Sequence, residues 1–105
     1  MATEIVVPTI VIGELVGGFR NGSRPAENEA VLERFLGEPS VSVVAITQAV
    51  ARRYGAIYAV LKRAGRPIPT NDMWIAACAQ EAGAHLLSFD SDFGAITDLS
   101  WSRLS

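Results

Sequence analysis

Four carboxylates stand where the chain could bring them to one edge of a sheet. Asp72 opens a helix in the stretch PIPTNDMWIAACAQEAG, and Asp90 and Asp92 directly follow the apolar run HLLSF. Glu14 lies within an apolar helical segment that offers few other polar groups. In open parallel sheets, ligands bind beyond the carboxyl ends of the strands. These four side chains are therefore the candidate functional groups.

Acidic side chains gathered at one edge suit a metal ion. Three or four carboxylates would repel one another, and a hard divalent cation with oxygen ligands relieves that repulsion. Such a site can activate water and hold a phosphodiester in line for attack. The sequence pattern thus favours hydrolytic chemistry on a phosphodiester.

Each carboxylate also has a simpler explanation. Asp72 can act as a helix cap, the DSD segment can be an ordinary turn, and Glu14 can lie on a solvated helix face. Thr70 and Asn71, just before Asp72, can also cap, so the helix has more capping capacity than it needs. That surplus gives some weight to a functional role for Asp72, and the pattern leaves both explanations open.

Length and charge limit the other possibilities. A chain of 105 residues, half of them hydrophobic, predicts one domain over residues 1–105. A net charge of -2 argues against a protein that coats nucleic acid or membranes by bulk electrostatics. Eight of the nine basic residues are arginines, whose planar group suits phosphate. Arg20 and Arg66, at the ends of predicted elements, are the candidates for phosphate contacts.

The remaining chemical groups point to no second site. Cys78 is the one cysteine, which excludes a disulfide framework, and we expect it to be a small buried residue. We expect His85, the one histidine, to be hydrogen-bonded locally at a strand boundary. The longest early apolar run, IVVPTIVIG, is too short to span a bilayer and holds a proline. We therefore expect a soluble, cytoplasmic protein.

Short apolar runs alternate with longer periodic segments, which is typical of α/β folds with parallel strands. We expect strands over 4–8, 41–46 and 85–89 and helices over 10–19, 25–36, 48–64 and 72–83. Thr9 and Thr47 are the predicted caps of the first and third helices. Gly37 and Gly65 are the predicted ends of the second and third. A turn over 90–94 follows, and periodicity does not decide whether the tail holds an edge strand.

Three segments carry a family resemblance. IVIGEL, GRPIPTNDMWIAACAQEAG and LLSFDSDF, in this order and spacing, resemble the PIN-domain ribonucleases, in particular the VapC-type toxins of toxin-antitoxin pairs. The likeness runs from about residue 4 to residue 100. It implies an α/β, PIN-like three-layer fold, with a parallel sheet and helices on both faces.

The resemblance also implies roles for the carboxylates. Glu14, Asp72 and Asp90 match the family's catalytic and metal-binding residues, and Asp92 matches a further position that is often acidic. The implied cofactor is Mg²⁺ or Mn²⁺. The implied reaction is attack of a metal-activated water on RNA, which leaves phosphate on the 5' end and hydroxyl on the 3' end of the products.

Supporting residues and partners follow from the same resemblance. Ser88 stands where the family usually has a small hydroxyl residue that helps the site, and Asn71 is a second supporting candidate beside Asp72. The implied partners are an RNA substrate, a cognate antitoxin and a second copy of the chain. No membrane association is expected.

One departure from the family pattern alters this expectation. PIN domains begin with a strand that carries a metal-binding aspartate, and this chain starts where the family's second strand would be. Without that central strand, we expect 4–8 and 85–89 either to pair directly or to be covered by a second copy, which we favour. We also expect weak metal binding and low nuclease activity. The alternative function is a catalytically impaired PIN fold that binds RNA, an antitoxin or its own copy.

Overall fold

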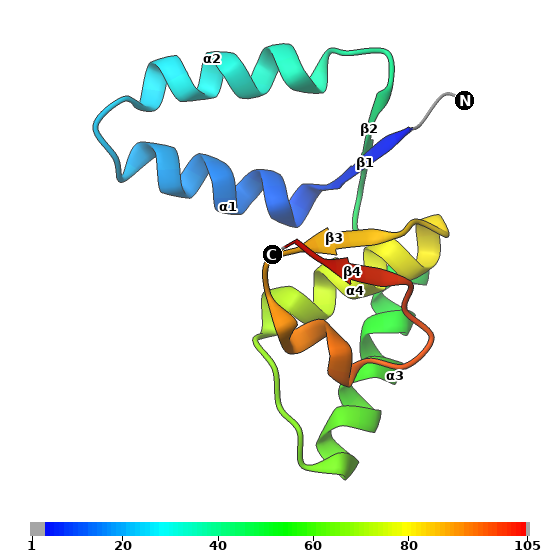
Figure 1. Ribbon diagram of the computed structural model, residues 1–105. Helices are drawn as coiled ribbons and strands as arrows, with labels where there is room; N and C mark the ends of the chain where they lie inside the picture. The colour runs from blue at the N-terminus through cyan, green and yellow to red at the C-terminus, as the bar shows by residue number, and fades with distance from the viewer. Residues whose placement is uncertain (1–3, 105) are drawn as a thin grey trace. The chain divides into compact units, whose positions relative to one another are not determined.

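The computed structural model describes residues 4–104, which form four α-helices, one short 3-10 helix and four strands (Figure 1). The contacts group these residues into two compact units, one ending at Ala45 and the other beginning at Ile46. The elements follow in the order β1 (Ile5–Pro8), α1 (Thr9–Arg20), α2 (Pro25–Leu36), β2 (Val41–Val44), α3 (Gln48–Ala64), α4 (Thr70–Ala82), β3 (Leu86–Ser88), η1 (Ser91–Ala95) and β4 (Trp101–Arg103).

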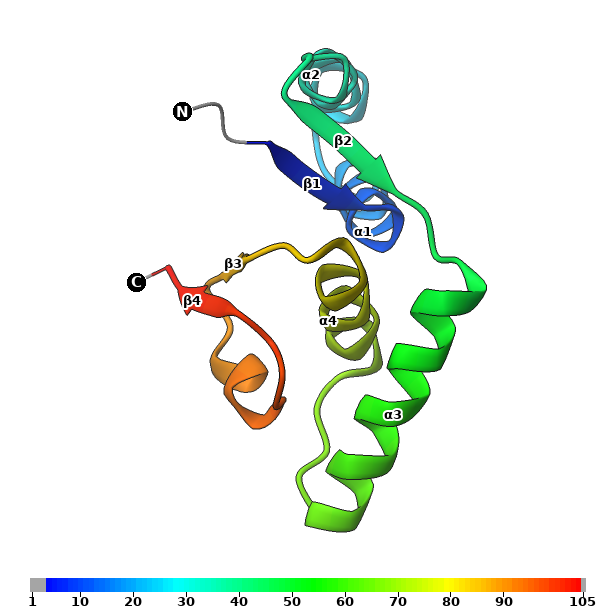
Figure 2. The same ribbon diagram turned by 90° about the vertical axis from the view of Figure 1, so that its right-hand side faces the viewer.

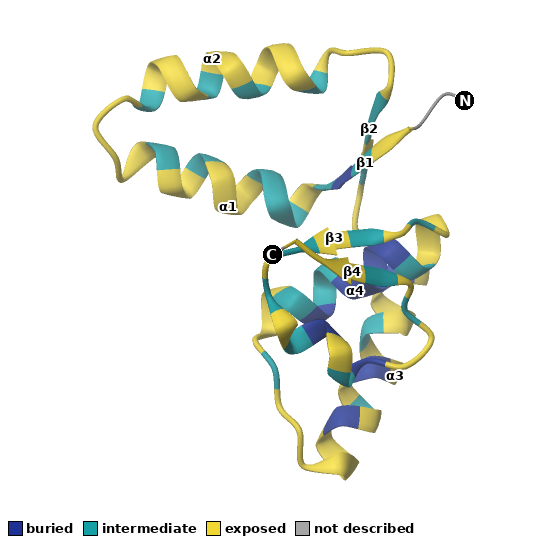
Figure 3. Ribbon diagram, viewed as in Figure 1, coloured by how far each residue is buried: buried dark blue, intermediate teal, exposed yellow. Residues whose placement is uncertain are grey.

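The first unit is a parallel strand pair whose strands are connected by two helices. β1 pairs with β2 so that Ile5 lies opposite Val41 and Pro8 opposite Val44 (Figure 2). The connecting helices α1 and α2 contact each other and contain no buried residue (Figure 3). This β-helix-helix-β connection between parallel strands confirms the predicted α/β pattern for this half of the chain.

Prolines begin both helices of the first unit. The prediction that Thr9 caps the first helix is wrong, because Thr9 is already helical and Pro8 is the N-cap residue. The φ of Pro8, -65°, is one at which the ring holds the backbone without strain. Pro25 occupies the start of α2 and Gly37 follows its last residue, as predicted.

The second unit packs α3 against α4 and adds the parallel pair of β3 and β4, in which Leu86 lies opposite Trp101. Figure 3 shows the buried residues of this unit gathered where the two helices face each other. Cys78 is among them and is fully buried, as predicted. The core consists of Val50, Ile57, Leu61, Met73, Ala76, Ala77, Cys78, Phe93 and Ile96.

The ends of α3 match the sequence signals. The Thr47 hydroxyl oxygen accepts a hydrogen bond from the Val50 amide at 3.2 Å, so the predicted cap is confirmed. Gly65 ends the helix with a φ of 65°, in the left-handed region that favours glycine. These two residues define how α3 enters and leaves the core of the second unit.

The strands form two separate parallel pairs, one in each unit. β4 shows that the tail does hold the strand that periodicity left undecided. β1 pairs with β2 and β3 pairs with β4. The expectation that 4–8 and 85–89 pair directly or are covered by a second copy stays a prediction. None of the helices within residues 4–104 is both long enough and apolar enough to cross a membrane.

Candidate metal centre

Asp72 lies in the first turn of α4, half-buried, where helix amides favour negative charge. The carbonyl of Pro69, the N-cap residue, accepts hydrogen bonds from the backbone amides of Asp72 at 3.1 Å and Met73 at 3.3 Å. The predicted caps Thr70 and Asn71 are therefore wrong, because both residues are already inside the helix. The helix begins two residues earlier than predicted, which leaves Asp72 within its first turn.

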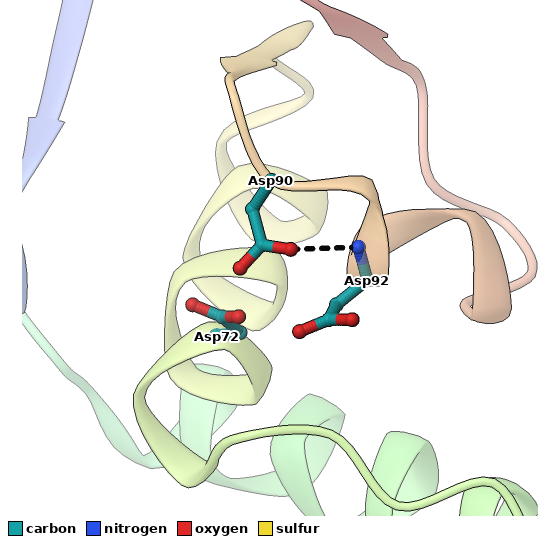
Figure 4. Close-up of side chains that lie close together, drawn as sticks. All are labelled: Asp72, Asp90 and Asp92. Carbon is teal, nitrogen blue, oxygen red and sulfur yellow. Dashed lines mark hydrogen bonds between the residues drawn. The ribbon is translucent and has the colours of Figure 1, made fainter.

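Asp90 is positioned by the end of β3 and by the short helix that follows. Its carboxylate Oδ1 accepts a hydrogen bond from the Asp92 backbone amide at 2.9 Å, which caps η1 (Figure 4). The Ser88 hydroxyl oxygen accepts from the Asp90 amide at 3.1 Å. These two hydrogen bonds turn the chain sharply after the strand, so that the side chains of Asp90 and Asp92 project on the same side.

Three carboxylates converge between α4 and the segment after β3. Asp72, Asp90 and Asp92 each offer one oxygen, and these three oxygens lie within 4.8 Å of one another. Figure 4 shows the carboxylates of Asp90 and Asp92 directed toward that of Asp72. Hard divalent cations hold oxygen ligands at about 2.0–2.6 Å, so oxygens on one ion lie up to roughly 5 Å apart. The cluster has the donor atoms and the spacing for such an ion.

The pKa values of Asp90 and Asp92 are shifted in opposite directions. The pKa of the Asp90 carboxyl is held below its usual value, first by the hydrogen bond from the Asp92 amide. Hydrogen bonds with the side chains of Asp72 and Asp92 and the positive charge of Arg103 act in the same direction. The pKa of Asp92 is raised by burial, then by the negative charge of Asp90 and the hydrogen bond between them. Bringing a cation to the cluster would relieve this repulsion.

The other predicted site residues are not among these three carboxylates. Glu14 is exposed on α1, in the first unit, and its approach to the three aspartates stays a prediction. Arg20 forms an exposed ion pair with Glu29 at 3.2 Å. Arg66 is exposed in the segment between α3 and α4.

Two polar residues of the β3–β4 pair complete the surroundings. His85 directly precedes β3, at the predicted strand boundary, but its hydrogen-bond partners are not local in the sequence. Its Nδ1 lies 2.5 Å from the Ser100 hydroxyl and its Nε2 2.7 Å from that of Ser102. Sequence reasoning missed Arg103. Its Nε donates a hydrogen bond to the Phe89 carbonyl at 3.3 Å, and its positive charge helps to lower the pKa of Asp90. The one available signal was its position in a tail strand whose existence periodicity did not decide.

Comparison with known proteins places this chain in a family. The sequence profile described as PIN domain matches residues 1–99. Ribonuclease VapC1 of Haemophilus influenzae (strain R2866) is 35% identical over 99 residues, which cover 93% of this chain and 72% of that protein.

Solved structures agree with the sequence matches. The structure of VapBC-1 from nontypeable Haemophilus influenzae superposes with a TM-score of 0.85 at 30% identity, over 95% of this chain and 74% of that one. VapBC2 from Rickettsia felis, solved bound to a DNA fragment from its promoter, shares the fold with a TM-score of 0.87 at 24% identity, over 97% and 76% of the two chains. The profile match, the related sequences and the shared fold together show that this chain belongs to the PIN domain family.

Proposed function

We propose that this chain is an endoribonuclease of the VapC toxin type that depends on a bound divalent cation. The observation that carries the proposal is the cluster of Asp72, Asp90 and Asp92, whose carboxylate oxygens lie within 4.8 Å of one another. Membership of the PIN domain family and similarity to a protein named Ribonuclease VapC1 support the same activity.

The proposed ligands of the cation, Mg²⁺ or Mn²⁺, are Asp72, Asp90 and Asp92, with Glu14 completing the set. When bound, such an ion would supply charge stabilisation for the phosphate and would orient and polarise the attacking water. Asp90, whose pKa is lowered, stays a negative ligand to a lower pH than an ordinary carboxyl does. Asp92, whose pKa is raised, accepts a proton at a carboxylate oxygen more readily than Asp90 does.

Neighbouring residues have supporting roles in this proposal. Ser88 holds the backbone of Asp90 through the 3.1 Å hydrogen bond to its amide. Asn71 adjoins Asp72 in the first turn of α4. Arg20 and Arg66 are proposed phosphate contacts, because both are exposed cations at the ends of helices.

The proposed partners are an RNA substrate, a cognate antitoxin and a second copy of the chain. The similar solved structures are those of VapBC proteins, and this similarity supports an antitoxin partner. Because the proposed substrate is RNA, the proposed place of action is the cytoplasm.

One PIN domain profile spans both compact units, which supports treating residues 1–105 as one domain.

Asp72→Asn tests this proposal, because asparagine keeps the size of the side chain but offers no charge to a cation. We expect wild-type protein to cleave single-stranded RNA, at a low rate, only when Mg²⁺ or Mn²⁺ is present. We expect Asp72→Asn to lower Mn²⁺ affinity by roughly tenfold or more, with little change in melting temperature. Titration calorimetry and a gel cleavage assay measure the two effects.

Glu33→Gln is the matched control, since it removes an exposed carboxylate of α2 that lies outside the cluster. It should leave metal affinity and cleavage unchanged. RNA cleavage that persists in excess chelator would overturn the metal dependence. Unchanged Mn²⁺ affinity in Asp72→Asn would show that Asp72 has only a structural role.

A further inference from the structure

A column of aromatic rings runs along one side of α3 in the second unit. Trp74 of α4 stacks on Tyr54, with ring centroids 4.0 Å apart and planes inclined by 17°. Tyr54 in turn stacks beside Tyr58 at 6.4 Å and 22°, and the Lys62 ammonium lies 5.7 Å from the centroid of the Tyr58 ring. The three residues of α3 are spaced four apart, so they share one stripe of the helix. The column leads from half-buried rings to an exposed cation.

The exposed end of this column opens into a pocket. The pocket has a volume of about 410 Å³, within the range of roughly 300–1,000 Å³ that ligand sites occupy. Tyr58, itself 45% exposed, forms one side of it. No residue that lines the pocket is acidic, and its lining includes Tyr58, Leu61, Lys62, Pro67, Ile68 and Met73. The pocket thus combines an accessible aromatic ring, an apolar floor and one positive charge.

Three exposed positive charges lie at this end of α3. Lys62, Arg63 and Arg66 are all exposed. Within residues 4–104, the ion pairs involve other arginines, and none links these three cations to a carboxylate. An aromatic ring beside exposed cations is the combination that binds single-stranded nucleic acid, because bases stack on rings and phosphates seek positive charge.

The pocket and the acidic cluster share one turn of α4. Thr70 and Met73 line the pocket, whereas Asp72, between them in the sequence, belongs to the cluster on the other side. An α-helix with its side chains is about 10–12 Å across, so a strand passing round the start of α4 would reach from one to the other. A long RNA could therefore occupy both at once.

We propose that this pocket binds one base of a single-stranded RNA, stacked on Tyr58, with the adjoining phosphates held by Lys62 and Arg66. The flexible Lys62 side chain leaves the Tyr58 ring to contact a phosphate, which opens the ring face to the base. Stacking accepts every base, so the pocket contributes affinity and direction along the strand without selecting a sequence. The inference rests on the proposed ribonuclease function.

Binding of a labelled short single-stranded RNA, followed by fluorescence anisotropy in chelator, tests the inference without cleavage. Tyr58→Leu keeps an apolar side chain but removes the ring, and should weaken binding by roughly 5- to 150-fold. Tyr58→Phe should bind as wild type does. Lys62→Gln should weaken binding and lower the slope of the salt dependence by about one. Val60→Ala, at an exposed position of α3 outside this pocket, is the control and should bind normally.

The outcomes separate this inference from the function on which it rests. Wild-type protein that cleaves RNA with Mg²⁺ or Mn²⁺, while folded Tyr58→Leu binds RNA normally, would overturn the stacking pocket alone. RNA binding that depends on Tyr58 without cleavage in either metal would overturn the nuclease proposal alone. If Tyr58→Leu changes the sedimentation of the protein but not its RNA affinity, the pocket is an interface between copies and the inference is wrong.

Discussion

Two aspartates, only two residues apart, contribute to stability with opposite signs. Ionised Asp90 is stabilised in the fold, because its pKa is lowered first by the hydrogen bond from the Asp92 amide. Ionised Asp92 is disfavoured, because burial and the charge of Asp90 raise its pKa. Residues whose pKa is shifted by burial and by a neighbouring charge are common at functional sites, so the unfavourable charge of Asp92 is consistent with a functional role.

We therefore predict that Asp92→Asn raises the melting temperature of the metal-free protein at neutral pH, whereas Asp90→Asn lowers it. Asparagine at position 92 removes a negative charge that the folded protein disfavours. Asparagine at position 90 removes the negative charge that strengthens the hydrogen bond from the Asp92 amide. Both variants should bind Mn²⁺ more weakly. Thermal melts in chelator and calorimetric titrations check the two parts, with Glu33→Gln as the control.

The pH dependence of these effects follows from the directions of the two shifts. The raised pKa of Asp92 penalises the fold at pH values above the ordinary carboxyl pKa, about 3.9, and has no effect once the group is protonated in both states. The gain from Asp92→Asn should thus be full at neutral pH and vanish below about pH 3–4. The benefit from Asp90 is present above that same ordinary value and is lost as pH falls through the lowered pKa. A gain from Asp92→Asn that persists in acid would contradict the charge explanation.

At the scale of elements, α3 has one glycine in its interior and another directly after its last residue. Gly65 has a φ of 65°, and alanine there should cost about 1–2 kcal/mol of unfolding free energy. Gly55 lies inside α3, and a Cβ added there meets no atom within 4 Å, so Gly55→Ala should stabilise by about 0.5–1 kcal/mol. Urea denaturation of both variants measures the difference. Equal effects at the two positions would show that backbone conformation is not what selects glycine at 65.

Local end signals in the sequence predicted the boundaries of α2 and α3. Thr47 and Gly65 bracket α3, and Pro25 and Gly37 bracket α2, because caps and breakers act through backbone groups within a few residues. The aspartates after β3 could be placed by the same local reasoning, since a strand followed by DSD turns at its carboxyl end.

Features that depend on packing between segments could not be predicted. α4 begins at Thr70 and not at Asp72, because Pro69 serves as N-cap without a side-chain hydrogen bond. The i, i+4 spacing of Tyr54 and Tyr58 was visible, but the stacking partner Trp74 comes from another helix, which no single periodic pattern specifies. The positions of Asp72 at a helix start and of the aspartates after β3 suggested that they meet. The packing of α4 beside that segment, which brings their oxygens within 4.8 Å of one another, could not be predicted from the sequence.

At the scale of the whole molecule, the two compact units make the single-domain proposal testable. Both tryptophans, Trp74 and Trp101, lie in the second unit, whereas the far-UV circular dichroism of the chain includes α1 and α2 of the first. If residues 1–105 unfold as one domain, urea curves from tryptophan fluorescence and from circular dichroism coincide. Gly55→Ala should then shift both curves equally. Separate midpoints would mean that the units are independently stable.

The chain contains a single lysine, Lys62, and its ammonium lies beside the exposed ring of Tyr58. An amine-acylating reagent therefore has one side-chain target besides the α-amino group, and mass spectrometry of the one peptide that contains Lys62 reads its modification. A lysine-specific protease likewise has one bond to cut, after the third-last residue of α3. The rate of either reaction therefore reports the accessibility of Lys62. A molecule bound in the neighbouring pocket should slow both reactions, so binding can be followed without attaching a label to the protein.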